Sequence, residues 1–300
     1  MISRQGNDGA GAPDSSATSQ PRRRWRAAAG LLFSWRILRP VLAIYLVLMV
    51  LMMFLEESLI FFPTKYPGGR WTPPSDLPVE DVWFDAPDGV ALHGWYIPHP
   101  QPRAVILFCN GNAGNLSGRI DMARALRNAA DATVLLFDYR GYGRSEGSPH
   151  EAGVLADGRA ARALLAQKAA VAPDRIVLMG ESLGGAVAVD LAADGGARAV
   201  ILEHTFDALP NVAAYHYPMF PVRWLLRTRL DSASKIGRYH GPLLITHGTA
   251  DTIIPLSFGR RLFEQANPPK QFLEIPGADH NDPMSRSYYE ALDRFLREAP

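Results

Sequence analysis

The stretch RIVLMGESLGGAVAVDLAA, residues 175–193, joins a short apolar run to an alanine-rich one through a serine flanked by glycines. Residues 175–179 are mostly apolar, as expected of a strand buried on both faces. Residues 183–193 have the length and composition of a helix. The pattern Gly-x-Ser-x-Gly at 180–184 therefore predicts a sharp turn from strand to helix that lifts Ser182 out of a sheet. Glycines fit there because a strained, closely packed backbone leaves little room for side chains.

The same five-residue pattern occurs a second time, at residues 143–147 around Ser145. Its context differs, because Ser145 lies in the loop sequence DYRGYGRSEGSPHEAG and no strand leads into its first glycine. A reactive serine needs the strand-to-helix turn and a neighbouring base, since a free hydroxyl is a poor nucleophile. Ser182 is therefore the candidate nucleophile, and Ser145 is expected to be a loop residue.

Short apolar runs alternate with helical stretches on both sides of Ser182, which predicts a mostly parallel sheet covered by helices on both faces. The first two strands have no helix between them and should form an antiparallel hairpin at one edge. The eight expected strands are 82–85, 91–97, 104–109, 133–138, 175–179, 199–203, 243–247 and 272–275. The expected helices are 118–130, 151–169, 183–193, 256–265 and 285–297.

Residues 204–239 interrupt this alternation with a long, proline-containing and aromatic segment. A connection of this length is typical of a lid or binding element. Tyr217, Phe220 and Trp224 are accordingly candidate substrate-binding residues. The alternative is that these aromatic side chains simply pack onto the core.

Three regions are expected along the chain: a disordered basic tail at 1–36, a transmembrane anchor and juxtamembrane segment at 37–62, and a catalytic domain at 63–300. The anchor is predicted from VLAIYLVLMVLMMFL at residues 41–55. A cleaved signal peptide and a buried or interfacial helix are the alternatives. The arginines that precede the run favour a cytoplasmic N-terminus and an extracytoplasmic catalytic domain.

Composition restricts the classes of partner and cofactor. Lys and Arg number 31 and Asp and Glu 30, so a net charge of +1 gives no reason to expect nucleic acid as a partner. The single cysteine, Cys109, ends an apolar run and is expected to be a buried strand residue. The sequence has no cluster of His and Cys with metal-ligand spacing, so neither a metal nor another cofactor is expected.

The base and acid follow from chain order, because a serine at such a turn is followed by its acid and then by its base. His280 lies in a loop after the last expected strand, in the sequence PGADHN. Asp251 lies in the loop after the preceding strand, where it can orient an imidazole and stabilise its protonated form. His247 is expected to be structural, and His204 either binds substrate or has no role.

Two backbone amides are expected to stabilise the oxyanion that forms when an acyl carbonyl is attacked. The N–H of Leu183 lies at the start of the helix, where the helix dipole adds positive potential. The second donor is expected from Asn112, in the loop CNGNAGN at 109–115. An ordinary Gly/Asn turn is the alternative interpretation of this loop.

The chain resembles the Bem46-type α/β-hydrolases, close to the membrane-anchored depalmitoylase-like and serine-aminopeptidase-like hydrolases. The resemblance rests on SLIFFPT at 58–64, CNGNAGN at 109–115, FDYRGYGRSEG at 137–147, GESLGG at 180–185, HGTADTIIP at 247–255 and PGADHN at 276–281. It implies an α/β-hydrolase fold with Ser182, Asp251 and His280 as the triad. The oxyanion loop of the family commonly begins His-Gly-Asn, whereas this chain has Asn110 in place of the histidine.

The expected function is hydrolysis of a carboxylic ester or acyl thioester through an acyl-enzyme, without cofactor or metal. The anchor and the aromatic segment favour a small-molecule or lipid-like acyl substrate near the bilayer. An aminopeptidase of the same fold is one alternative, although the segment 204–239 offers only Asp207 and Asp231 to hold a free amine. A non-catalytic membrane-anchored binding protein is the other.

Overall fold

The computed structural model describes residues 22–300, with side chains from residue 35 onward, and divides into the units Met1–Leu51 and Met52–Pro300. The first unit contains most of helix α1 (Arg22–Phe54). Within α1, Trp35–Phe54 is long and apolar enough to cross a membrane, and none of it is buried. Helix formation from Arg22 differs from the expected tail at 1–36, of which residues 1–21 lie outside the described part.

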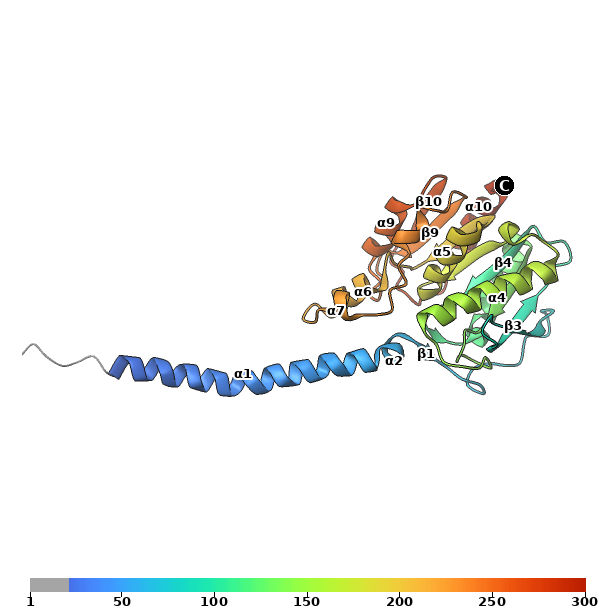
Figure 1. Ribbon diagram of the computed structural model, residues 1–300. Coiled ribbons are helices and arrows are strands. Elements are labelled where there is room, and N and C mark those ends of the chain that lie inside the picture. Colours follow the sequence, from blue (N-terminus) through green and yellow to red (C-terminus); the bar gives the residue numbers. More distant parts are fainter. Residues whose placement is uncertain (1–21) are drawn as a thin grey trace, which may run out of the picture. The chain divides into compact units, whose positions relative to one another are not determined.

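The second unit is built on an eight-stranded sheet of order β10-β9-β8-β7-β4-β6-β3-β2 (Figure 1). The strands from β10 to β6 are parallel, and β3 and β2 are added antiparallel at the edge. The strands are β2 (Glu80–Asp85), β3 (Ala91–Ile97), β4 (Ala104–Cys109), β6 (Ala132–Phe137), β7 (Val177–Glu181), β8 (Ala199–Glu203), β9 (Leu243–Gly248) and β10 (Lys270–Ile275). All eight expected strands are present, and the first two form the expected hairpin.

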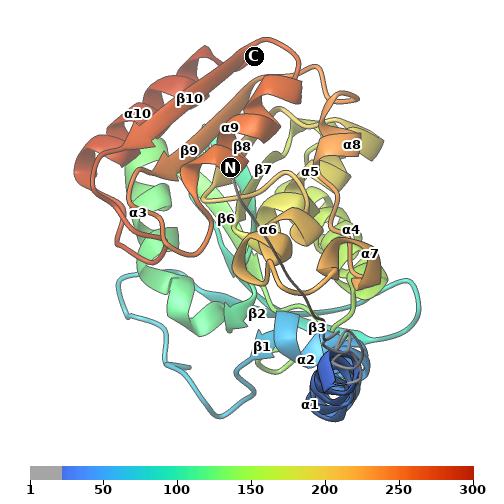
Figure 2. The ribbon, with the colours of Figure 1, turned by 90° about the vertical axis from the view of Figure 1, so that its left-hand side faces the viewer.

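Helices cover both faces of this sheet and bury a separate apolar core on each. The face packed by α3 (Ile120–Ala130) and α10 (Arg286–Glu298) includes Phe108 and Leu136. The face packed by α4 (Glu151–Ala169), α5 (Leu183–Gly195), α8 (Ala233–Ile236) and α9 (Leu256–Gln265) includes Leu107 and Leu178. Figure 2 shows α3 and α10 on one side and α4 and α5 on the other. Because the central strands are buried on both sides, their sequences are continuously apolar.

The insertion between β8 and β9 carries α6 (Leu209–His216), α7 (Val222–Leu225) and α8. Its middle is bonded to the short helix α2 (Glu56–Ile60) just after α1. The Glu56 side chain is buried and accepts hydrogen bonds from the backbone N–H groups of Arg227, at 3.1 Å, and Thr228, at 2.6 Å. Helix α2 and the insertion are therefore joined within the second unit.

The segment 56–63 also contacts the loop that follows β4. Strand β1 (Phe62–Pro63) pairs with β5 (Ala113–Gly114), and the side-chain amide of Asn112 donates to the carbonyl of Ile60 at 2.9 Å. Between β4 and α3 the chain also forms the 3-10 turn Leu116–Arg119, and a second turn, Pro173–Arg175, precedes β7. The residues just after α1 thus help to fix the conformation of the expected oxyanion loop.

Candidate active site

Ser182 lies between the end of β7 and the start of α5, with φ 54° and ψ −117°. Such a positive φ is rare and strained for a residue other than glycine, and strain of this kind concentrates at functional positions. The Ser182 N–H donates to the carbonyl of Glu203 at 2.8 Å. A Cβ on Gly180 would collide with the backbone of Gly184, and one on Gly184 with the carbonyl of Cys109. These collisions explain both glycines of the motif.

The two expected oxyanion donors flank this turn. Leu183 is the first residue of α5, where backbone N–H groups have no acceptor within the helix. The loop with Asn112 passes close to Ser182, since a Cβ on Gly111 would lie 3.6 Å from the Ser182 Cβ. The carbonyl of Asn112 accepts hydrogen bonds from the Phe62 N–H, at 2.9 Å, and the Tyr142 hydroxyl, at 2.7 Å. These two hydrogen bonds hold the peptide groups of this loop in one orientation.

The structure brings Asp251 and His280 together in loops at the carboxyl ends of β9 and β10. The Asp251 Oδ2 lies 2.8 Å from the His280 Nδ1, and both side chains are buried. The other oxygen, Oδ1, accepts from the N–H groups of Ile253 and Ile254 at 3.0 and 2.7 Å. Since Ser182 follows β7, all three candidate residues lie at the carboxyl ends of the strands, in the region where open α/β sheets bind ligands.

Two further histidines also contact Asp251, and the sequence did not predict this. His204 Nδ1 lies 3.2 Å and His247 Nε2 3.3 Å from the same Oδ2. Burial alone would raise the pKa of Asp251, but hydrogen bonds from the three histidines and the backbone outweigh it and hold that pKa far below its usual range. Asp251 is therefore ionised throughout the neutral range.

The candidate ligand atoms of His204, Asp251 and His280 lie within 4.8 Å of one another, a spacing that could hold a metal ion. The hydrogen bonds among them provide a sufficient reason for this spacing without an ion. Cys109 is buried at the end of β4, and burial raises the pKa of its thiol. It is thus the buried strand cysteine that the sequence predicted.

The three candidate substrate-binding aromatics lie in the insertion, between α6 and the end of α7. Trp224 is 84% and Tyr217 53% exposed, whereas Phe220 is half-buried. Tyr217 and Trp224 therefore do not pack into the core, which was the alternative interpretation. Whether they contact a substrate remains a prediction.

Glu203, whose backbone carbonyl accepts from the Ser182 N–H, also has a buried side-chain carboxyl. Glu203 ends β8, and its Oε1 accepts a hydrogen bond from the Tyr288 hydroxyl. Burial raises the pKa of Glu203 to about 8, because the charged form would lose its hydration. Below the ordinary pKa of 4.5 both the folded and the unfolded chain hold this proton, and between 4.5 and about 8 only the folded chain does. Stability therefore decreases as pH rises through this range.

Glu203→Gln is expected to remove this pH dependence, because an amide keeps an acceptor for Tyr288 and carries no charge. The gain in unfolding free energy should be small near pH 4 and ~3–5 kcal/mol at pH 9. Thermal unfolding at both pH values measures it. Glu264→Gln, at an exposed position on α9, is the control and should show no such difference. If the stability of Glu203→Gln depended on pH as that of the wild type does, the raised pKa of Glu203 would not be the cause of this dependence.

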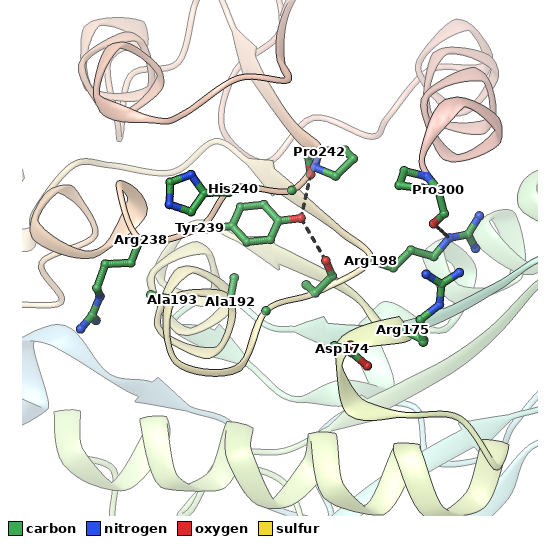
Figure 3. Close-up of a pocket in the computed structure, with 13 residues that line it drawn as sticks. Asp174, Arg175, Ala192, Ala193, Arg198, Arg238, Tyr239, His240, Pro242 and Pro300 are labelled. Carbon is green, nitrogen blue, oxygen red and sulfur yellow. Dashed lines mark hydrogen bonds between the residues drawn. The ribbon is translucent and has the colours of Figure 1, made fainter.

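A cavity of about 410 Å³ lies near the amino ends of β7, β8 and β9 (Figure 3). It is lined by residues that precede β7, β8 and β9, by the end of α5 and by Pro300, with Arg238 and Tyr239 among them. The Tyr239 hydroxyl donates to the carbonyl of Pro242 at 3.1 Å, and Arg198 donates to the carbonyl of Pro300. Because Ser182, Asp251 and His280 are at the carboxyl ends of the strands, this cavity does not belong to the candidate active site.

Comparison with known proteins identifies the family. Residues 104–231 match the model of the alpha/beta hydrolase fold. The chain is 42% identical over 269 residues to Rv2307c of Mycobacterium tuberculosis, covering 86% of this chain and 95% of that protein. It is 31% identical over 257 residues to the alpha/beta hydrolase domain-containing protein WAV2 of Arabidopsis thaliana, covering 77% and 83%. The chain belongs to the α/β-hydrolase family.

Solved structures show the same fold at lower sequence identity. The Pyrococcus furiosus esterase Pf2001 superposes with a TM-score of 0.67 at 19% identity, covering 80% of this chain and 98% of that one. The α/β-hydrolase fold predicted from the sequence is thus confirmed.

Proposed function

We propose that this α/β-hydrolase is a serine hydrolase that cleaves carboxylic esters or acyl thioesters. The observation that carries the proposal is the strained Ser182 at the start of α5, with the buried Asp251–His280 pair on the same edge of the sheet. A pair of this kind supplies the base that a serine hydroxyl needs. Esterases among the proteins of similar fold support this class of reaction.

The reaction follows from the proposed roles. Ser182 Oγ attacks the acyl carbonyl while His280 Nε2 accepts the hydroxyl proton. The N–H groups of Leu183 and Asn112 stabilise the oxyanion, and Asp251 holds the Nδ1 proton of His280. Collapse of the tetrahedral intermediate breaks the bond to the leaving group, which receives the proton from His280. Water, deprotonated by His280, then attacks the acyl-enzyme, releases the acid and restores Ser182.

The chain is proposed to be a Bem46-type member anchored by Trp35–Phe54, with the N-terminus cytoplasmic and the catalytic unit extracytoplasmic. The length and apolar character of this helix support an anchor, and the arginines before it support the orientation. A lipid-like acyl substrate would reach such an enzyme from the bilayer. The exposed Tyr217 and Trp224 are apolar surface that could contact it.

The aminopeptidase alternative gains no support from the insertion. Asp207 is bound to Arg261, with Oδ2 3.0 Å from Nε, and Asp231 accepts from the Ser234 N–H at 3.1 Å. Arg261 thus already neutralises Asp207, and Asp231 is bonded to the backbone of its own loop. We therefore retain ester or thioester hydrolysis as the proposal.

A panel of chromogenic substrates tests the reaction class on the full chain in detergent. We expect hydrolysis of p-nitrophenyl esters and acyl thioesters, with a dependence on acyl length, and little cleavage of aminoacyl p-nitroanilides. Preference for the anilides would favour the aminopeptidase. No turnover of any substrate, together with no labelling of the folded protein by a fluorophosphonate, would favour the non-catalytic binding protein.

A further inference from the structure

The carboxylate of Asp251 has more donors than the proposed triad requires. Its Oδ1 is occupied by two backbone N–H groups, and its Oδ2 faces both the His280 Nδ1 at 2.8 Å and the His204 Nδ1 at 3.2 Å. The His204 and His280 rings meet edge to face, with centroids 5.6 Å apart. With His247 Nε2 at 3.3 Å, three imidazoles therefore face one carboxylate oxygen, two of them through Nδ1, although hydrolysis in the proposed mechanism uses only His280.

The backbone around His204 is strained and is bonded to the nucleophile. His204 has φ 48°, a left-handed conformation that is uncommon for residues other than glycine, and its side chain is buried. On one side of it, the Glu203 carbonyl accepts from the Ser182 N–H at 2.8 Å. On the other, the Thr205 hydroxyl donates to the Ser182 carbonyl at 2.8 Å. Residues 203–205 thus connect the turn of the nucleophile to the side chain of Asp251.

The proton on the His204 Nδ1 follows from its partner. An ionised carboxylate can only accept hydrogen bonds, so the 3.2 Å contact requires an N–H at Nδ1. The Gly248 N–H approaches the same nitrogen at 3.4 Å, a longer contact with a weaker partner. The Nδ1–H tautomer therefore gives the more favourable arrangement.

We propose that His204 is a positioning residue of the active site. It holds the carboxylate of Asp251 in place, and it competes with His280 for the negative charge of that carboxylate. This role rests on the proposed function and extends it, since it adds a fourth residue to the three of the triad. His204 does not contact the reacting atoms in the proposed mechanism. It acts through Asp251 on the orientation of His280 and on the readiness of His280 to hold a proton.

The direction of the effect follows from the charges around the pair. Besides His204, Asp251 faces His247, whose Nε2 donates chiefly to the Ile254 carbonyl at 2.7 Å. The backbone N–H of His280 donates to Asp279 at 2.8 Å. Removing the donor at His204 leaves more of the Asp251 charge to favour the protonated imidazole of His280. A higher pH is then needed to free the base, so the acidic limb of the pH–rate profile should move to higher pH.

The experiment compares His204→Leu with His204→Asn in the full chain in detergent. Asn places its amide nitrogen near the position of the histidine Nδ1 and can keep the donor, whereas Leu fills the space without one. We expect His204→Leu to lower kcat ~10–100-fold with KM nearly unchanged, and to move the acidic limb up by about 0.5–1 pH unit. His204→Asn should keep most of the wild-type kcat and the wild-type position of the acidic limb. His240→Leu, in the cavity near the amino ends of the strands, is the control and should leave kcat and the acidic limb unchanged.

Equal losses in His204→Leu and His204→Asn with an unmoved acidic limb would overturn the inference and leave His204 a packing residue. A readout without turnover separates this failure from failure of the proposed function. The ¹⁵N signals of labelled histidines report the tautomer, and the signal missing from His204→Leu identifies His204. A proton on Nδ1 supports the inference, and its absence from Nδ1 overturns it, whether or not the wild type hydrolyses esters.

Discussion

Ser182→Ala is expected to lower kcat for ester hydrolysis ~10⁵–10⁶-fold and to abolish labelling by a fluorophosphonate. The reason is chemical, because alanine leaves His280 with no hydroxyl to deprotonate and the acyl group with no covalent acceptor. Residual catalysis above the uncatalysed rate should remain, since the N–H groups of Leu183 and Asn112 would still stabilise an oxyanion formed by water. Single-turnover kinetics and probe labelling of the same preparation measure both effects.

Ser145→Ala is the matched control, because Ser145 is the other serine in a Gly-x-Ser-x-Gly pattern. Its hydroxyl donates to the Asp138 carbonyl at 2.8 Å and accepts from the His93 N–H at 2.9 Å. It thus joins two buried backbone segments, and its loss should lower stability by ~1–3 kcal/mol while labelling persists. Labelling that survives in Ser182→Ala and disappears in a folded Ser145→Ala protein would reverse the assignment of the nucleophile.

The sheet could be predicted because each central strand is a continuous apolar run between helical stretches. The observed strand boundaries differ from the predicted ones where a local turn takes up residues of the apolar run. Strand β7 was expected at 175–179 and is found at Val177–Glu181, because Pro173–Arg175 forms a 3-10 turn. Paired segments of two residues, β1 and β5, have no periodicity that a sequence could reveal. Helices α7 and α8 have four residues each and were likewise not separated within the expected lid.

The candidate site was predictable as far as chain order determines it. Ser182, Asp251 and His280 each follow a strand in the expected order, and the structure places Asp251 and His280 within hydrogen-bonding distance. His204 follows a strand that contributes no residue to a conventional triad, so chain order gave it no role. The available signal was polar Glu203-His204-Thr205 at the end of a fully apolar central strand. Polar residues at the carboxyl end of such a strand lie on the same side of the sheet as Ser182, which follows the neighbouring strand β7.

Asp251→Asn is expected to lower kcat ~10⁴-fold, a smaller loss than that of Ser182→Ala. The amide can face His280 with either its oxygen or its nitrogen. With the nitrogen toward Nδ1, it would favour the tautomer that carries its proton on Nε2, and this tautomer cannot accept the Ser182 proton. The loss should affect kcat more than KM, because the buried Asp251 is not expected to touch the substrate.

Asp251→Asn should also destabilise the fold, because the acceptor shared by three buried histidines loses its charge. We expect a loss of ~2–4 kcal/mol in unfolding free energy, measured by chemical denaturation alongside the kinetics. Asp279→Asn tests the rival carboxylate beside His280, whose oxygens accept from Thr252 and from the His280 N–H. If Asp279→Asn lowered kcat more than Asp251→Asn did, Asp279 would be the acid. The three histidines around Asp251 would then be a structural cluster, and His204 would lose its proposed role with them.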